Sequence, residues 1–372
     1  MSIFGRIDKG ILFSSLLLMA FGIVFVYSSS FAVAEQKFGG SDFFLFRHLF
    51  RAGLGITGLF VFMNWDYHKV SKLSRLGYFV AIAMLVYILM LPDSTAINGS
   101  KRWINLGFLR FQVSEFARII MIIAVASTIS NLESSIKDRN TFFMLLAKVG
   151  VICALIVLEP DYSTAMLTGV IGFAVIFVAG ARLSHIAMIV VGIIPVGIIG
   201  VISSPYRYRR LIAFMNLSDS KSDIGYQTYQ SLVGLGNGGL FGTGLGQGEQ
   251  KFFFLPEPYT DFIFSMIGEE IGFIGLMIVL GVFSFLIYSG LKVAMNAPDK
   301  LGQLIAFGLT LVIAVYATLH IAVNTGLVPT TGVPFPFLSY GGMSLVFNMC
   351  SIGILLNISS QRAQANPLGK RN

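Results

Sequence analysis

The stretch Leu255-Pro-Glu-Pro-Tyr-Thr-Asp-Phe-Ile-Phe-Ser-Met-Ile-Gly-Glu-Glu-Ile-Gly272 places Glu257 and Asp261 just before an apolar segment, and Glu269 and Glu270 within it. A charged side chain at the centre of a membrane helix costs about 2.5–3.5 kcal/mol on insertion scales. The chain has only 18 acidic residues, so four beside one apolar run indicate that at least one is used. We therefore interpret this stretch as the entrance to a functional site at one membrane face.

The composition is that of a membrane protein. Of 372 residues, 55% are hydrophobic and 12% are charged, and the mean hydropathy is +0.79. A soluble domain carries about 25% charged residues, so most of this chain must face lipid or other helices. Cys153 and Cys350 lie in apolar runs, which argues against a disulfide framework. The net charge of +8 is scattered through short loops, which favours anionic lipid head groups over nucleic acid as its partner.

Apolar runs of spanning length predict an all-α polytopic integral membrane protein with about ten transmembrane helices in one domain, residues 1–372. The first run follows Arg6 and Lys9 but is too long for the core of a signal peptide, so we interpret it as a helix. The runs cover residues 11–34, 46–64, 75–92, 113–131, 141–158, 161–180, 183–203, 262–291, 302–324 and 340–358.

Loop charges give the expected orientation. Over all loops the basic residues divide almost equally between the two sides, but without the longest loop they favour the side of the termini. Because basic residues in short loops stay in the cytoplasm, we place both termini there. The long loop between helices 7 and 8, residues 204–260, is then extracytoplasmic.

This large loop combines basic and aromatic residues with a glycine-rich run. Arg207 and Arg210 lie near its start, and the run Gly234–Gly248 follows. Dense glycines permit positive φ and a close approach of backbone to a ligand. No Walker lysine follows, which argues against a nucleotide-binding loop. A flexible lid is one interpretation, and a loop that binds sugar and phosphate is the one we favour.

Two further outer segments carry unusual polar residues. The segment Asn98–Arg118 contains Lys101 and Arg102, and then Glu115 and Arg118 at a spacing of three residues. The latter two could form an ion pair that enters the membrane, or Arg118 could join Lys101 and Arg102 in binding a phosphorylated lipid. The segment Asn324–Gly342 is rich in proline and glycine, and non-helical backbone at a membrane edge is typical of a site.

Several motifs, in order along nearly the whole chain, resemble those of the SEDS family (shape, elongation, division and sporulation), the FtsW/RodA-type membrane glycosyltransferases. Gln250-Lys251 and the ending Gly353–Ser359 favour the cell-division FtsW branch, whereas Thr331 does not. The motifs are Gly99–Ile104, Phe111–Glu115, Glu159–Asp161, Gln230–Leu232, Leu255–Glu257, Thr260–Phe264, Gly268–Glu270 and Pro336–Gly342.

The resemblance implies a peptidoglycan glycosyltransferase that polymerises lipid II into β-1,4-linked glycan and releases undecaprenyl pyrophosphate, for cell division or elongation. Asp261 matches the position of the catalytic base, although an aspartate there could simply cap the next helix. No organic cofactor is implied, but a divalent cation, Mg or Mn, could be held by Glu257 and Asp261. The substrate-binding residues that we expect are Arg47, Lys101, Arg102, Glu115, Arg118, Arg207, Arg210, Glu257 and Ser339.

The resemblance also implies a location and partners. We expect a multi-pass protein of the bacterial plasma (inner) membrane with its active site on the extracytoplasmic face. Its expected partners are lipid II, undecaprenyl-linked glycan, a class B penicillin-binding protein and other divisome or elongasome membrane proteins. A lipid II flippase and a non-enzymatic scaffold are the alternatives. Glu269 and Glu270 lie deeper than Asp261, and we expect them to be paired packing residues.

Overall fold

The computed structural model describes residues 7–92, 102–107, 109–132, 136, 138–182, 200, 202, 205–215, 225–252 and 254–365. It confirms the all-α membrane fold, because eight helices of this part are long and apolar enough to cross a membrane. A ninth apolar helix, α6 (Tyr162–Val178), is shorter. The predicted span at 183–203 lies outside the described residues except for Gly200 and Ile202. The eight are α1 (Lys9–Phe38), α2 (Phe43–Asn64), α3 (Tyr67–Met90), α4 (Val113–Asn131), α5 (Arg139–Leu158), α10 (Ile263–Met295), α11 (Lys300–Asn324) and α12 (Ser344–Ala365).

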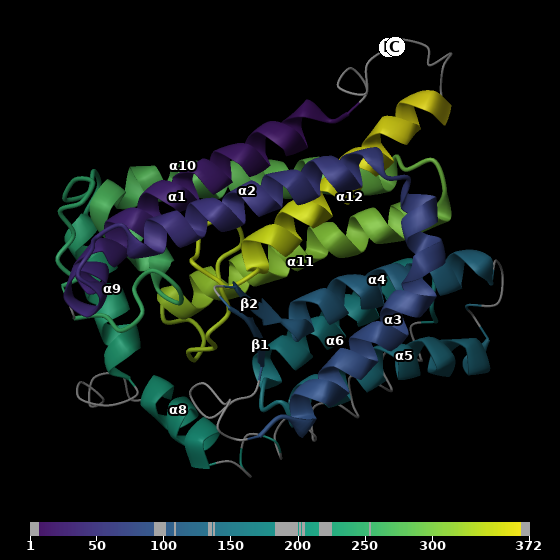
Figure 1. Cartoon of the computed structure of the whole chain (residues 1–372), viewed down its shortest axis with the longest axis horizontal. Coiled ribbons are helices and arrows are strands. Elements are labelled where there is room, and N and C mark those ends of the chain that lie inside the picture. Colours follow the sequence, from purple (N-terminus) through teal and green to yellow (C-terminus); the bar gives the residue numbers. More distant parts are fainter. Residues whose placement is uncertain are drawn as a thin grey trace.

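The long helices form two groups that run in roughly the same direction (Figure 1). One group contains α1, α2, α10, α11 and α12, and the other contains α3, α4, α5 and α6. Helix α11 contacts both α4 and α6 and so joins the groups. Helix α4 is largely buried, whereas α3 and α5 each expose an apolar face, as expected where helices meet lipid.

Aspartates begin many of these helices. The side chain of each accepts a hydrogen bond from a backbone N–H of the first turn, which would otherwise lack a partner. Much of the small acidic complement of the chain is therefore structural. These residues are Asp8 before α1, Asp66 before α3, Asp138 before α5, Asp161 before α6 and Asp299 before α11.

A β-hairpin, which the sequence analysis did not predict, precedes α4. Strands β1 (Trp103–Leu106) and β2 (Leu109–Gln112) pair antiparallel, with Trp103 opposite Gln112. Gly107 adopts a φ of 72° in the turn, a conformation that favours glycine. A side chain at Gly342 would collide with the Trp103 ring, so the hairpin lies against the segment before α12.

The large loop is partly helical. It contains α8 (Pro205–Met215) and α9 (Tyr226–Gly238), and α9 packs along α10. The alternative of a flexible lid does not fit residues 226–238, which are helical. We expected the backbone of the glycine-rich run to approach a ligand closely. In the structure this backbone closely approaches α10. Whether it also binds a ligand stays a prediction.

The glycine-rich run packs against α10 where that helix is broken. Gly272 has φ 68° and ψ −173° in the middle of the helix. The glycine-rich segment fills the break, because Phe273 N–H donates to Gly239 O (2.9 Å) and Thr243 N–H donates to Glu269 O (2.9 Å). Backbone groups freed from the helix thus find partners inside the protein, as a membrane requires.

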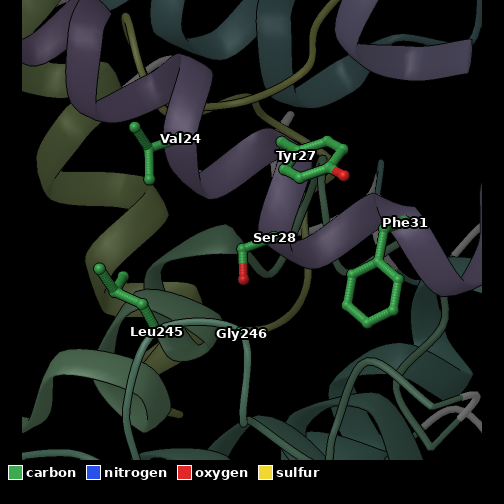
Figure 2. Close-up of a pocket in the computed structure, with 6 residues that line it drawn as sticks. All are labelled: Val24, Tyr27, Ser28, Phe31, Leu245 and Gly246. Atoms are coloured by element: carbon green, nitrogen blue, oxygen red, sulfur yellow. The ribbon is translucent and has the colours of Figure 1, made fainter. Parts of the chain in front are cut away.

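Glu269 and Glu270 secure the same junction. The Lys251 ammonium, fully buried, lies 2.7 Å from the Glu270 carboxylate, which also accepts a hydrogen bond from Ser28 of α1. Glu269 accepts hydrogen bonds from the backbone N–H groups of residues 249 and 250. These contacts agree with the expected packing role of both residues. A pocket of about 390 Å³ opens beside Ser28, between α1 and the loop at Leu245 (Figure 2).

The substitution Gly272→Ala tests this junction. Its Cβ would lie 2.3 Å from Gly242 N, and a positive φ costs a residue with a side chain about 1–3 kcal/mol. We expect the apparent Tm in detergent to fall by several degrees or more. Gly281→Ala, in the same helix with open space around it, is the control and should leave the Tm unchanged or raised. Equal Tm values for the two variants would contradict the packing described.

Candidate functional site

Asp261 lies in the turn that leads into α10. The N-cap of α10 is Phe262, which makes no side-chain capping bond, so Asp261 does not cap this helix. The side chain is partly exposed, and its β-carboxyl lies 3.6 Å from where a side chain at Gly332 would begin. The turn itself closes through backbone hydrogen bonds from residues 260 and 261 to Glu257 O. The capping alternative is thereby removed, and the carboxyl is left available to a ligand.

The last residue of α11 and the segment between α11 and α12 hold this turn in place. Asn324, fully buried, donates to Asp261 O (3.0 Å) and accepts a hydrogen bond from the N–H of Ser265 (3.2 Å). Ser339 donates to Thr260 O (2.7 Å), and the N–H of Tyr340 donates to residue 259 O (2.9 Å). The turn that carries Asp261 is thus held by three hydrogen bonds from outside it, one at each of residues 259, 260 and 261.

Charges of both signs act on the Asp261 carboxyl. Burial, and then repulsion by Glu257, raises its pKa to about 6, while attraction by Arg210 and Arg102 opposes the rise. Arg210 belongs to α8, and its Nη1 donates to Thr330 O (2.9 Å). The structure therefore brings together four of the predicted site residues: Asp261, Glu257, Arg102 and Arg210.

Arg102 also contacts the turn between α5 and α6. Its Nη2 donates to Pro160 O (3.0 Å), and its Nη1 lies 3.6 Å from Asp161 Oδ2. Asp161 caps α6, because its side chain accepts a hydrogen bond from the N–H of Thr164 (3.2 Å). Burial and the charge of Asp161 raise the pKa of Glu159 to about 8. Lys101, also predicted to bind substrate, lies outside the described residues.

Glu115 and Arg118 are buried deeper, in the first turns of α4. Nη1 of Arg118 contacts the Tyr316 hydroxyl of α11, and its guanidinium stacks on the ring, 4.2 Å from the centroid. In the part of the chain that the structure describes, Glu115 Oε2 and Arg118 Nε have no hydrogen-bond partner. The polar contact of Arg118 is thus to Tyr316, and both residues keep hydrogen-bonding capacity for another group.

The remaining predicted residues lie in different surroundings. Arg47 is exposed and stacks on Phe43, 4.2 Å from the ring centroid, and Arg207 stacks on Tyr162 at 3.6 Å. The cations that most affect the pKa of Asp261 are instead Arg210 and Arg102. Ser339 is buried and its hydroxyl is occupied by Thr260, so we reassign it from substrate binding to positioning.

Sequence reasoning missed three residues near the site. His48 and Arg51, one turn apart on α2, are both buried against Tyr340; the Arg51 guanidinium is 4.3 Å from the Tyr340 centroid. Both His48 ring nitrogens, and Nε and Nη1 of Arg51, lack a partner within the described chain. The sequence signal that could have identified His48 and Arg51 is a pair of basic residues one turn apart in an apolar helix. Asn324 was considered only as the first residue of the segment Asn324–Gly342, and its neighbours in the sequence gave no indication of its contact with Asp261.

Glu257 and Asp261 form a pair of carboxylates, and no third His, Cys, Asp or Glu joins them among the residues described. Mg²⁺ commonly binds one or two carboxylates together with substrate phosphates and keeps several waters. The pair therefore fits a cation that arrives with a phosphorylated substrate, and the cation stays a prediction.

Comparison with known proteins shows similarity along almost the whole chain. A family described as "cell cycle protein" (FtsW/RodA/SpoVE) matches residues 9–364. Relatives include stage V sporulation protein E of Bacillus subtilis, 40% identical over 93% of this chain and 94% of that protein. A probable peptidoglycan glycosyltransferase FtsW of Trichlorobacter lovleyi is 37% identical over 98% of this chain and 96% of that protein.

Solved structures show the same fold. A chain from a study of a peptidoglycan synthase complex superposes with a TM-score of 0.79, covering 96% of this chain and 99% of that one at 23% identity. The rod shape determining protein RodA of Thermus thermophilus gives 0.72 at 23% identity, over 96% of this chain and 97% of that one.

The positioning role of Ser339 can be tested without an activity assay. In Ser339→Ala the Thr260 carbonyl loses its donor, so we expect faster hydrogen–deuterium exchange in a peptide covering 255–262. Ser351→Ala is the matched control, because the hydroxyl of this buried serine donates to Phe347 O of its own helix. If both variants exchange at the wild-type rate in 255–262, the contact does not hold the turn.

Proposed function

The chain belongs to the FtsW/RodA/SpoVE family, and we propose that it is a peptidoglycan glycosyltransferase that polymerises lipid II into β-1,4-linked glycan, for cell division or elongation. The names of its FtsW relatives, which it matches over nearly their full length, support this activity. The observation that carries the proposal is that Asp261 does not cap α10, is partly exposed and lies near the charges of Arg102 and Arg210.

Asp261 is the proposed general base. The 4-hydroxyl of the acceptor sugar must lose its proton as its oxygen attacks C1 of the donor, and a nearby carboxylate accepts that proton. The bond from C1 to the phosphate oxygen breaks on the opposite face, so the configuration inverts. A pKa of about 6 suits this task, because the carboxylate is ionised at neutral pH yet is more basic than an exposed aspartate.

Basic residues would stabilise the leaving group. Departure of undecaprenyl pyrophosphate develops negative charge, which preorganised cations stabilise. Arg102 and Arg210 are best supported, because their charges already act at Asp261. Arg118 and Glu115 would bind a deeper part of the lipid-linked substrate. A divalent cation held by Glu257 and the pyrophosphate would neutralise further charge.

The chain is a multi-pass membrane protein, and we place it in the bacterial plasma membrane with both termini in the cytoplasm. Asp261 and the helices of the large loop then lie on the extracytoplasmic side. The basic residues of short loops support this orientation. So does the chemistry, because polymerised glycan is needed outside the membrane.

A class B penicillin-binding protein is the proposed partner. One structural neighbour comes from a peptidoglycan synthase complex in which polymerisation and crosslinking are coordinated. A polymerase of this kind supplies strands to a crosslinking enzyme, and we expect contacts through a membrane-helix face and the large outer loop. Other divisome or elongasome membrane proteins would join the same assembly.

The central test replaces the base. Asp261→Asn keeps the size of the side chain but cannot accept a proton, so we expect glycan synthesis from lipid II to fall by at least about 10²-fold. The assay uses the purified protein with its partner and measures polymer length and yield. Glu249→Gln, an exposed carboxylate of the same loop, should retain activity.

Folding and base chemistry are separable in this test. Removing a carboxylate that is costly to ionise should leave the Tm of Asp261→Asn at pH 7 equal to or above that of wild type. A stable variant with full activity would refute the base assignment and direct attention to Glu257. Inactive wild type in every partner and cation condition would favour the flippase or scaffold alternative.

The rate should also depend on pH. Because the pKa of Asp261 is raised to about 6, the carboxylate is protonated and inactive below that pH and ionised above it. We expect kcat/KM to rise about tenfold per pH unit below pH 6 and to level off above pH 7. A rate independent of pH between 5 and 7 would contradict the role of Asp261.

A further inference from the structure

Helices α3 and α5 lie side by side at the edge of the second helix group (Figure 1). A hydrogen bond sets their register, because the Tyr78 hydroxyl of α3 donates to Lys148 O of α5 (2.7 Å). Lys148 belongs to the apolar part of α5, where a lone ammonium is costly.

The Lys148 ammonium is only partly satisfied. Its Nζ donates to Thr128 Oγ1 of α4 (2.6 Å), and Thr128 in turn donates to Ala124 O (2.7 Å). An ammonium has three N–H donors, and the contacts of the described residues account for one of them. Because Thr128 lies in the last turn of α4, the charge sits near the membrane boundary although its Cα is deeper.

A second cation lies beside it. Arg75 is one turn before Tyr78 on the same face of α3, and it is close enough to Lys148 for the two charges to repel. Lys72 follows one turn nearer the start of α3 and is exposed. None of the three forms an ion pair within the part of the chain described. Like charges held together at a membrane boundary repel each other, and an anion bound between them would relieve that repulsion.

The surroundings match an amphipathic anion. Exposed apolar side chains flank the cations, namely Leu76 and Phe79 on α3 and Phe143 and Met144 on α5. Side chains on both helices lean toward the helix start, which is the cytoplasmic end in the proposed orientation. The cations therefore reach the level of the phosphates of the cytoplasmic leaflet, and the apolar residues reach the level of acyl chains.

We propose that Lys148 and Arg75 bind the phosphate of one anionic phospholipid of the cytoplasmic leaflet, with Lys72 contributing charge and with the acyl chains against α3 and α5. This site is distinct from the site at Asp261 and does not depend on the proposed enzymatic activity. Basic positions between membrane helices at the cytoplasmic face commonly bind anionic lipid head groups. A free phosphate shares the head-group chemistry but would gain nothing from the apolar flanks.

The test is lipid binding by the full chain in detergent, measured by native mass spectrometry with phosphatidylglycerol and phosphatidylcholine. We expect wild type to bind one phosphatidylglycerol about tenfold or more tighter than phosphatidylcholine. The double variant R75Q/K148Q should lose that preference. Lys292→Gln, which removes an exposed cation at the end of α10, should keep it.

Further arms keep the test decisive. Arg75→Gln alone changes an exposed residue, so a loss of preference in a variant with the wild-type Tm cannot be ascribed to unfolding. Equal binding of the two lipids by wild type, or an unchanged preference in R75Q/K148Q, would overturn the proposal. If inorganic phosphate at the same concentration as the lipid prevented wild type from binding phosphatidylglycerol, that result would also overturn the proposal, in favour of a soluble anion.

Discussion

Everything at the candidate site depends on one constraint, which is that backbone polar groups within a membrane need partners inside the protein. The chain breaks helical structure at Gly272 and again between α11 and α12, and the break at Gly272 is filled by another segment. The glycine-rich run satisfies α10 at its break, and Asn324 and Ser339 satisfy the turn before α10. A carboxyl can therefore stand at a fixed position without capping a helix.

Neighbouring charges and burial then set the basicity of the Asp261 carboxyl. Burial and Glu257 disfavour the charge of Asp261, and Arg102 and Arg210 favour it, which leaves a carboxylate suited to accept a proton at neutral pH. Arg210 reaches the site from α8, and Arg102 from the β-hairpin side, so the large loop and the α3–α4 connection both contribute. The buried pair Lys251 and Glu270 links the same loop to α10 and, through Ser28, to α1.

Much of the fold and part of the candidate site could be predicted from the sequence, for identifiable reasons. Long apolar runs specify membrane helices directly, and the carboxylates beside one of them indicated a functional site there. The choice of Asp261 among those carboxylates came from the resemblance to the SEDS family. The β-hairpin was missed because its strands have four residues each and its only strong signal is Gly107. The contacts of Asn324 with Asp261 and of Ser339 with Thr260 could not be predicted, because they join residues 63 and 79 positions apart.

The central claim is that the α11–α12 segment presents Asp261 to the acceptor hydroxyl. The most direct measurement is a high-resolution structure of Asp261→Asn with lipid II bound, since that variant should hold its substrates unreacted. The account predicts that the side chain at 261 lies within about 2.6–3.2 Å of the acceptor 4-hydroxyl, with the pyrophosphate toward Arg102 and Arg210. An acceptor hydroxyl directed at Glu257, or a pyrophosphate remote from both arginines, would contradict it.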